Sequence, residues 1–490
     1  MKFCFDSKDF IDIHLNPNKL AVVGDDFELT WTEFRTKVNE TVDVLIAQNL
    51  EYLANPVIIY GHKSANMMVA AYAMMKLEIA YIPVDLIYPT ERIQKIINTT
   101  DCQMIINTSN NPLKIDTISE LVMSETAFEF NNLTTNYKLS KNKIDPLVYI
   151  IFTSGSTGDP KGVQISTEAV QSFGRWMSSS DFGFTANDTF INTALLSFDL
   201  SVFEVMTFGY IGGTLLLNSK AQCSDPNVLM DRINTYQGNV WVSTPSFAIT
   251  YSRIENTTLL NSIHTFLFCG EILPQPLAKT LVNNFSQAKV INTYGPTEAT
   301  VATTLIEITP EIIEKYNPLP VGYSKMESDL LIEDNEILIV GPNVSKGYVK
   351  NEKLNKEKFV TRNNQRAFKT GDNGYFEDGL LFFNGRNDDL VKLHGYRIDL
   401  NEITSALNDL DYIDQAETIA LKRNDVVKKI VSLVKLKPNL TADKATIILD
   451  LENILPPYML PSDIKFVDAI PLNQNGKSDK KVQVKMYMKK

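Results

Sequence analysis

Histidine and cysteine are scarce in this chain, which has only four of each among its 490 residues. The cysteines, Cys4, Cys102, Cys223 and Cys269, are far apart and form no CxxC pair, so the sequence predicts neither a zinc site nor a disulfide framework. No HExxH or Gly-x-Ser-x-Gly motif accompanies the histidines, although histidine-centred catalysis stays possible. We therefore expect chemistry that depends on other groups.

Long hydrophobic runs and basic blocks are also missing. No stretch reaches the roughly 18 uninterrupted apolar residues of a spanning helix, and Asp6, Asp9 and Asp12 stand where a signal peptide has its apolar core. The formal net charge is −11, and no cluster of lysine and arginine is large enough to follow a phosphate backbone. These absences predict a cytoplasmic protein that neither inserts into a membrane nor binds nucleic acid.

The composition that is present, 44% hydrophobic and 21% charged residues, is typical of a globular enzyme of at least two domains. Helical and strand patterns alternate through the first part, beginning with a helix over 31–49 that Thr30 caps, which predicts largely parallel sheets. From about residue 325 short strands with hairpin signals follow, including the turn Asp378-Gly379, and the Asn/Lys-rich segment 350–358 is expected to be an exposed loop. We predict an α/β fold with a large domain over 1–387, including a small β-barrel-like subdomain, and a smaller α+β domain over 388–490.

The strongest local signal is the loop TSGSTGDPKG at 153–162, which directly follows the apolar run of a predicted strand. Its glycines let backbone N–H groups turn toward an anion, its hydroxyls add donors, and Lys161 supplies positive charge. A flexible linker would not follow a buried strand so directly. The loop is therefore predicted to bind phosphate, although it lacks the spacing of a Walker A motif.

Five motifs in this order make the chain resemble the adenylate-forming superfamily, which includes acyl-CoA synthetases and amino-acid adenylation domains. They are TSGSTGDPKG, NTYGPTE at 292–298, TGD at 370–372, GRNDDLVK at 385–392 and PLNQNGK at 471–477, and the match covers nearly the whole chain. The resemblance implies that a carboxylate attacks the α-phosphate of ATP, giving an acyl-adenylate and pyrophosphate, and that a thiol then captures the acyl group. Both steps concentrate negative charge, which Mg²⁺, cations and oriented donors must neutralise.

The same resemblance implies a role for each matching residue. The nucleotide-binding residues would be Thr153, Ser154, Thr157 and Lys161 on the phosphates, Asn292, Thr293, Tyr294, Gly295, Pro296 and Thr297 around the adenine and α-phosphate, Asp372 on the ribose, and Phe383, Asn384, Gly385 and Arg386 closing that side. Glu298 would hold Mg²⁺. Lys477 would be the catalytic residue, contacting ATP and the substrate carboxylate in the first step, and Asp388 would be the hinge about which a mobile C-terminal domain then withdraws it.

Asp199, in LLSFDLSVFE, implies an amino-acid substrate, because amino-acid-activating members pair this carboxylate with the α-ammonium. The segments FCGEILP, YGPTEATVA and VKLHGYRIDLNEI look like the D-alanine:D-alanyl carrier protein ligase family. That likeness implies that Cys269 and Val301 crowd the substrate α-carbon and leave space for one methyl group.

The implied substrates are ATP and D-alanine. The implied partner is a separate, small and acidic carrier protein with a 4′-phosphopantetheine thiol, which supplies D-alanine for teichoic acid. Three other interpretations stay open. They are an adenylation enzyme for another small amino acid, a short-chain acyl-CoA synthetase, and a catalytically silent nucleotide sensor.

Overall fold

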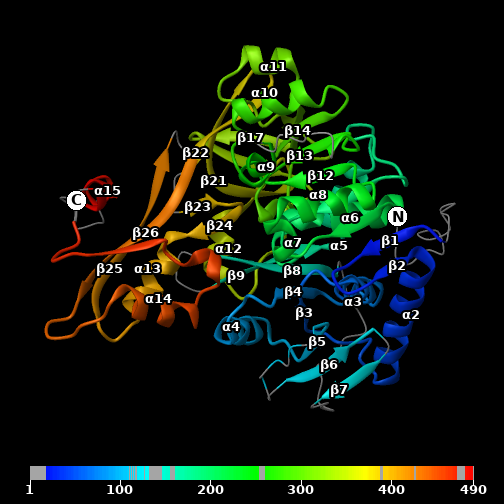
Figure 1. Ribbon diagram of the computed structural model, residues 1–490, viewed down its shortest axis with the longest axis horizontal. Helices are drawn as coiled ribbons and strands as arrows, with labels where there is room; N and C mark the ends of the chain where they lie inside the picture. The colour runs from blue at the N-terminus through cyan, green and yellow to red at the C-terminus, as the bar shows by residue number, and fades with distance from the viewer. Residues whose placement is uncertain are drawn as a thin grey trace. The chain divides into compact units, whose positions relative to one another are not determined.

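The computed structural model describes residues 18–109, 111, 113, 115, 118–125, 127–131, 146–154, 160–252, 260–386, 390–423, 426–471 and 480–488. The contacts of the chain divide it into two units, drawn in Figure 1. The larger unit comprises Met1–Leu86, Thr99–Ile151 and Gly162–Gly385, and the smaller unit comprises Ile87–Asn98, Phe152–Lys161 and Arg386–Lys490. Two N-terminal segments thus group with the C-terminal part. The predicted domain boundary between 387 and 388 stays a proposal, since it falls outside the described ranges.

An eight-stranded sheet in the order β19-β9-β8-β4-β3-β5-β6-β7 contains most of the first predicted α/β run. Its strands are β3 (Val57–Gly61), β4 (Tyr81–Asp85), β5 (Met104–Asn107), β6 (Ser119–Met123), β7 (Phe128–Asn131), β8 (Leu147–Thr153), β9 (Lys161–Ser166) and β19 (Gly347–Tyr348). β3 pairs in parallel with β4 and β5, and β4 pairs in parallel with β8, which confirms the prediction of largely parallel pairing.

The helices of this run are α2 (Trp31–Ala47), α3 (Ala65–Lys76) and α4 (Thr90–Thr100). Thr30 caps α2 as predicted: its hydroxyl oxygen accepts from the Glu33 backbone N–H over 3.3 Å, and the Glu33 carboxylate accepts from the Thr30 N–H over 2.8 Å. This reciprocal pair satisfies two of the N–H groups that every helix start leaves without a partner. The sequence therefore fixes the start of α2 locally.

A nine-stranded sheet in the order β16-β15-β14-β13-β12-β10-β11-β1-β2 also belongs to the larger unit. Its strands are β1 (Leu20–Val23), β2 (Glu28–Thr30), β10 (Thr189–Asn192), β11 (Thr214–Leu217), β12 (Val240–Ser243), β13 (Thr265–Phe268), β14 (Lys289–Tyr294), β15 (Thr304–Glu307) and β16 (Tyr323–Ser324). The helices in this part of the chain are α5 (Thr167–Met177), α6 (Val202–Ile211), α7 (Lys220–Ser224), α8 (Pro226–Thr235), α9 (Pro245–Ser252), α10 (Gln275–Asn284) and α11 (Pro310–Lys315). Strands β10 to β14 pair in parallel, so the segments after β13 and β14 leave the same edge of the sheet.

The predicted β-barrel-like part is a five-stranded antiparallel sheet. It consists of β17 (Asp329–Glu333), β18 (Glu336–Val340), β20 (Phe359–Arg362), β21 (Gln365–Glu377) and β22 (Leu380–Arg386). Asp378 and Gly379 connect β21 to β22 with φ values of 51° and 79°, as a type I′ hairpin turn requires, so the predicted turn is confirmed.

The expectation of a loop over 350–358 was wrong, because α12 (Glu352–Lys358) lies there. Asn351 caps this helix by accepting from the Leu354 N–H over 3.2 Å, and the Leu354 side chain packs against the main core. Glutamate, lysine and leucine are also good helix formers. The Asn355 side chain also bonds the Tyr348 backbone N–H and carbonyl, so the polar segment is held by contacts with residues before it in the chain.

The C-terminal part of the smaller unit is α+β, as predicted. It consists of β23 (Leu390–Leu393), β24 (Tyr396–Asp399), α13 (Leu400–Asn408), β25 (Ile413–Arg423), β26 (Val426–Leu436), α14 (Lys444–Glu452), β27 (Asp463–Phe466) and α15 (Lys480–Met488). Its buried apolar side chains form a core of their own, which includes Ile403, Ile430 and Leu451. This separate core is what a domain that folds around its own interior requires.

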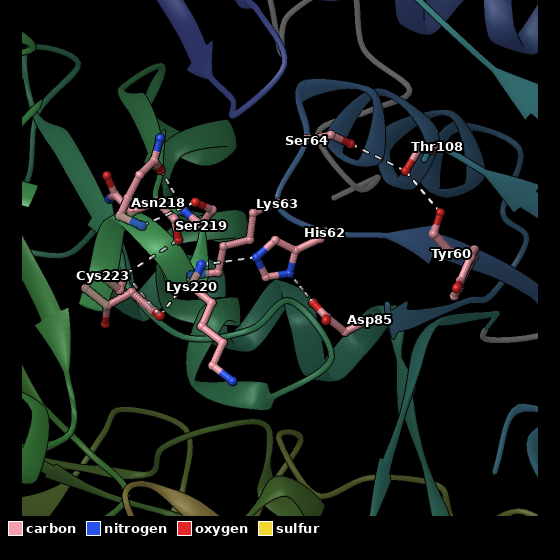
Figure 2. A network of polar contacts seen from close by, with 12 residues as sticks. Tyr60, His62, Lys63, Ser64, Asp85, Thr108, Asn218, Ser219, Lys220 and Cys223 are labelled. Atoms are coloured by element: carbon pink, nitrogen blue, oxygen red, sulfur yellow. Dashed lines mark hydrogen bonds and ion pairs between the residues drawn. The ribbon is translucent and has the colours of Figure 1, made fainter. Parts of the chain in front are cut away.

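A buried polar network joins the ends of β3, β4 and β11 within the larger unit (Figure 2). His62 Nδ1 lies 2.7 Å from Asp85 Oδ2, and the Lys220 backbone N–H donates to His62 Nε2 over 3.2 Å. Lys63 is 1% exposed and donates to the Thr193 carbonyl over 2.8 Å, and its burial lowers the pKa of the ammonium. Because both ring nitrogens have partners inside the fold, His62 links the ends of strands from the two large sheets. In the part of the chain that the structure describes, no helix is both long and apolar enough to cross a membrane.

Candidate active site

Asp199 begins the short helix η2 (Asp199–Ser201), directly before α6, and its side chain is buried. The Thr297 hydroxyl donates to Asp199 Oδ2 over 2.6 Å, so a residue predicted for the substrate and one predicted for the nucleotide lie in contact. The two motifs, almost 100 positions apart in the sequence, therefore meet at one carboxylate.

The end of β14 carries the motif predicted to surround the adenine and α-phosphate. The Tyr294 hydroxyl donates to Asp372 Oδ2 over 2.5 Å, and the Tyr294 ring lies 6.2 Å from the Phe383 ring. The side chains of Asn292 and Thr293 donate to backbone carbonyls of Pro320 and Phe268, both over 2.8 Å. The structure thus brings the predicted adenine and ribose residues together.

Glu298 lies in the short helix η4 (Thr297–Ala299) and is fully buried. The Tyr348 hydroxyl donates to Glu298 Oε1 over 2.6 Å, and the Ser345 backbone N–H donates to the Glu298 carbonyl over 2.8 Å. Mg²⁺ is usually held through one or two carboxylates together with substrate phosphates, so a single oriented carboxylate fits this ion. Within the described ranges no group of three or more acidic, histidine or cysteine side chains could hold a metal by itself.

Tyr348, which lies in β19, was assigned no role by the sequence analysis. Its partner is 50 positions away, and no local pattern links the two. The glycine and tyrosine of KGYVK give no indication that the hydroxyl points to Glu298.

Cys269 follows β13 and Val301 follows η4, and both are buried. The Cys269 sulfur lies 3.9 Å from the Val301 carbonyl oxygen. The residues predicted to crowd the substrate α-carbon are therefore in contact with each other.

The phosphate loop belongs in part to the smaller unit, where Thr153 ends β8 and Lys161 begins β9. The Thr153 hydroxyl is buried and has no hydrogen-bond partner among the described residues, as expected of a donor that awaits a ligand. The Ser154 hydroxyl donates to the Arg397 carbonyl over 2.6 Å and accepts from the Asp399 backbone N–H over 3.0 Å. The start of the loop thus joins β24 within the smaller unit.

The remaining predicted residues are placed less completely. Asn384 and Gly385 lie in β22 in the larger unit, and Arg386 is the first residue of the C-terminal segment of the smaller unit. Thr157, Asp388 and Lys477 lie outside the described residues. Their predicted roles stay predictions.

Two family models match the chain, namely AMP-binding enzyme over residues 12–349 and AMP-binding enzyme C-terminal domain over residues 402–477. The chain belongs to the AMP-binding enzyme family. This assignment confirms the predicted resemblance to the adenylate-forming superfamily and the prediction of an AMP-forming ligase.

Known proteins resemble this AMP-binding enzyme over almost its full length. It is 37% identical over 95% of its chain to a D-alanine--D-alanyl carrier protein ligase of Bacillus licheniformis, covering 96% of that protein. A protein of the same name from Bacillus cytotoxicus is 36% identical, with the same coverage of both chains. The adenylation domain AlmE of Vibrio cholerae, solved with glycyl-adenosine-5′-phosphate, matches with a TM-score of 0.82 and 21% identity over 96% of this chain and 95% of its own. That structural match confirms the fold.

Proposed function

We propose that the protein uses ATP to activate D-alanine as D-alanyl-AMP and transfers the D-alanyl group to the 4′-phosphopantetheine thiol of a separate, small acidic carrier protein in the cytoplasm. The near-full-length similarity to D-alanine--D-alanyl carrier protein ligases carries this proposal. The product would supply D-alanine for the esterification of teichoic acid.

The chemistry of the larger unit supports an amino-acid substrate. The Asp199 carboxylate is buried and held by Thr297, so it is suited to pair with a substrate α-ammonium. A simple carboxylic acid would leave this buried charge without a cationic partner, which is costly. Cys269 and Val301 would form the wall beside the α-carbon.

In the first step, an oxygen of the D-alanine carboxylate forms a bond to the α-phosphorus of ATP, and the bond from that phosphorus to the pyrophosphate breaks. Lys477 would neutralise charge on the attacking carboxylate and the α-phosphate. The hydroxyls of Thr153 and Thr157 and the ammonium of Lys161 would bind the phosphates, while Tyr294 and Asp372 would orient the adenosine. Ser154 would join them when its hydroxyl leaves the Arg397 carbonyl. In the second step the carrier thiolate bonds to the acyl carbon, and the bond to AMP breaks.

Glu298 would hold Mg²⁺, which would supply positive charge beside the phosphates when bound. Tyr348 fixes one oxygen of this carboxylate, so it would set the direction in which Glu298 presents its charge.

A substrate panel tests the proposed function directly. D-Alanine should drive ATP–pyrophosphate exchange with a kcat/KM about 10- to 200-fold above that of L-alanine, the range over which a pocket discriminates one methyl group. Glycine, D-serine, and acetate with coenzyme A serve as comparison substrates. Exchange that depends on another amino acid favours the alternative adenylation enzyme, acetyl-CoA formation favours the acyl-CoA synthetase, and ATP binding without turnover favours the sensor.

Tyr348→Phe should raise the Mg²⁺ concentration needed for half-maximal exchange about 10- to 150-fold, since a hydrogen bond to a charged group is worth about 1.5–3 kcal/mol. The D-alanine KM should stay nearly unchanged, because Tyr348 contacts the proposed metal ligand and not the acyl pocket. Tyr316→Phe is a matched control, since its hydroxyl donates to Asp378, outside the site, over 2.8 Å. An unchanged Mg²⁺ requirement in Tyr348→Phe would show that Glu298 does not depend on this contact.

A further inference from the structure

The turn after η4 has an unusual backbone. Thr300 has a φ of 55° and Val301 a φ of 68°, so two consecutive β-branched residues adopt the left-handed region. β-Branched side chains rarely adopt this region, and such backbone strain persists only where the surrounding structure holds it in place. The question is which contacts hold this turn.

Asn343, in the segment between β18 and β19, is completely buried and contacts the turn on both sides. Its Nδ2 donates to the Ala299 carbonyl over 3.1 Å and to the Thr303 hydroxyl over 2.9 Å. The Thr300 hydroxyl donates to the Asn343 backbone carbonyl over 2.7 Å. Asn343 thus forms hydrogen bonds with Ala299 before the strained pair, with Thr300 within the pair and with Thr303 after it.

The opposite side of the Asn343 amide has a different partner. Its Oδ1 accepts from the Ser328 hydroxyl over 2.8 Å, and this contact fixes which way the amide faces. A variant at Asn343 can therefore remove the donors to the turn while keeping the bond to Ser328.

The backbone at Gly295 packs closely against the other side of this turn and leaves it little room to move. A Cβ atom added at Gly295 would lie 2.5 Å from the Ala302 Cα and 2.8 Å from the Val301 carbonyl oxygen. The Val301 carbonyl in turn lies 3.9 Å from the Cys269 sulfur. The position of Val301 against Cys269 therefore depends on a turn held between Gly295 and Asn343.

We propose that Asn343 is a positioning residue that sets substrate selectivity at the acyl pocket without touching the substrate. It holds the strained Thr300–Val301 turn, which fixes the pocket wall formed by Val301 and Cys269. A turn that relaxes to ordinary backbone angles would move Val301 and admit the other enantiomer. This inference rests on the proposed function, since it gives Val301 and Cys269 a substrate to discriminate.

Asn343→Asp tests the inference, because it keeps the size of the side chain and its acceptor for Ser328 while removing both N–H donors to the turn. The ratio of kcat/KM for D-alanine to that for L-alanine should fall about tenfold, within the range that one methyl group can control. The KM for ATP should stay within about twofold of wild type. Ser328→Ala keeps the donors to the turn and loses only the contact that orients the amide, so it should lower the ratio less than Asn343→Asp does.

Thr300→Val provides a second measurement, because it removes only the hydrogen bond to the Asn343 carbonyl and should lower the same ratio. Thermal melting of each variant establishes that the protein is folded. A folded Asn343→Asp or Thr300→Val enzyme with an unchanged ratio, or with equal losses for both enantiomers, would overturn the inference. If the wild-type enzyme instead prefers another chiral amino acid, D-alanine is not the substrate, but the inference about Asn343 can still be tested. The ratio of kcat/KM is then measured for that amino acid and its enantiomer.

Discussion

Lys477→Ala is expected to lower D-alanyl-AMP formation about 10²–10³-fold, the typical cost of removing one group that stabilises transition-state charge. Transfer of the D-alanyl group from supplied D-alanyl-AMP to the carrier should stay nearly intact. In the proposed mechanism the ammonium would act on the attacking carboxylate and the α-phosphate, and neither bond change of the second step would need it. ATP–pyrophosphate exchange measures the first step, and a single-turnover assay with a holo-carrier measures the second.

Lys485→Ala is the matched control, because this lysine is exposed in α15 of the same C-terminal segment. It should leave both steps unchanged. Equal losses of both steps in Lys477→Ala would contradict the expectation that a mobile C-terminal domain withdraws Lys477 after the first step.

Asp199→Ala is expected to lower kcat/KM for D-alanine about 10²-fold or more, since removing one partner of a buried charge pair costs about 3–5 kcal/mol. The loss should be far smaller for propanoate, which has no ammonium group to pair. Measuring exchange with both acids in wild type and variant gives the coupling between Asp199 and the substrate ammonium.

Asp188→Asn controls for the loss of any buried carboxylate charge, because Asp188 accepts from His264 Nε2 over 2.9 Å and lies outside the predicted site. It should leave the preference for D-alanine over propanoate unchanged. Equal losses for the two acids in Asp199→Ala would place this carboxylate in a purely structural role and favour the acyl-CoA synthetase.

Local signals in the sequence were sufficient for most individual elements. The Thr30 cap of α2, the parallel strands of the first half and the Asp378-Gly379 turn depend on neighbouring residues, and all are present. Segment 350–358 was misassigned because its helix depends on Leu354 reaching the main core, a contact outside any local window.

The sequence motifs predicted which residues belong to the candidate site but not which of these residues contact one another. Motif order indicates that Asp199, Thr297, Tyr294 and Asp372 belong to one site, but not that Thr297 binds Asp199 or that Tyr294 binds Asp372. Supporting residues carry no recognisable pattern of their own. Asn343 acts through contacts that only the folded chain creates.

The parallel pairing of β13 with β14 places Phe268 beside Asn292. Cys269 and the 292–298 motif therefore lie at the ends of neighbouring strands of one sheet. Under the proposed function, a redesign for bulkier amino acids would vary the position after β13 together with Val301, which contacts it, and leave β14 unchanged. Substitutions at these few positions would let the same sheet accept other amino acids.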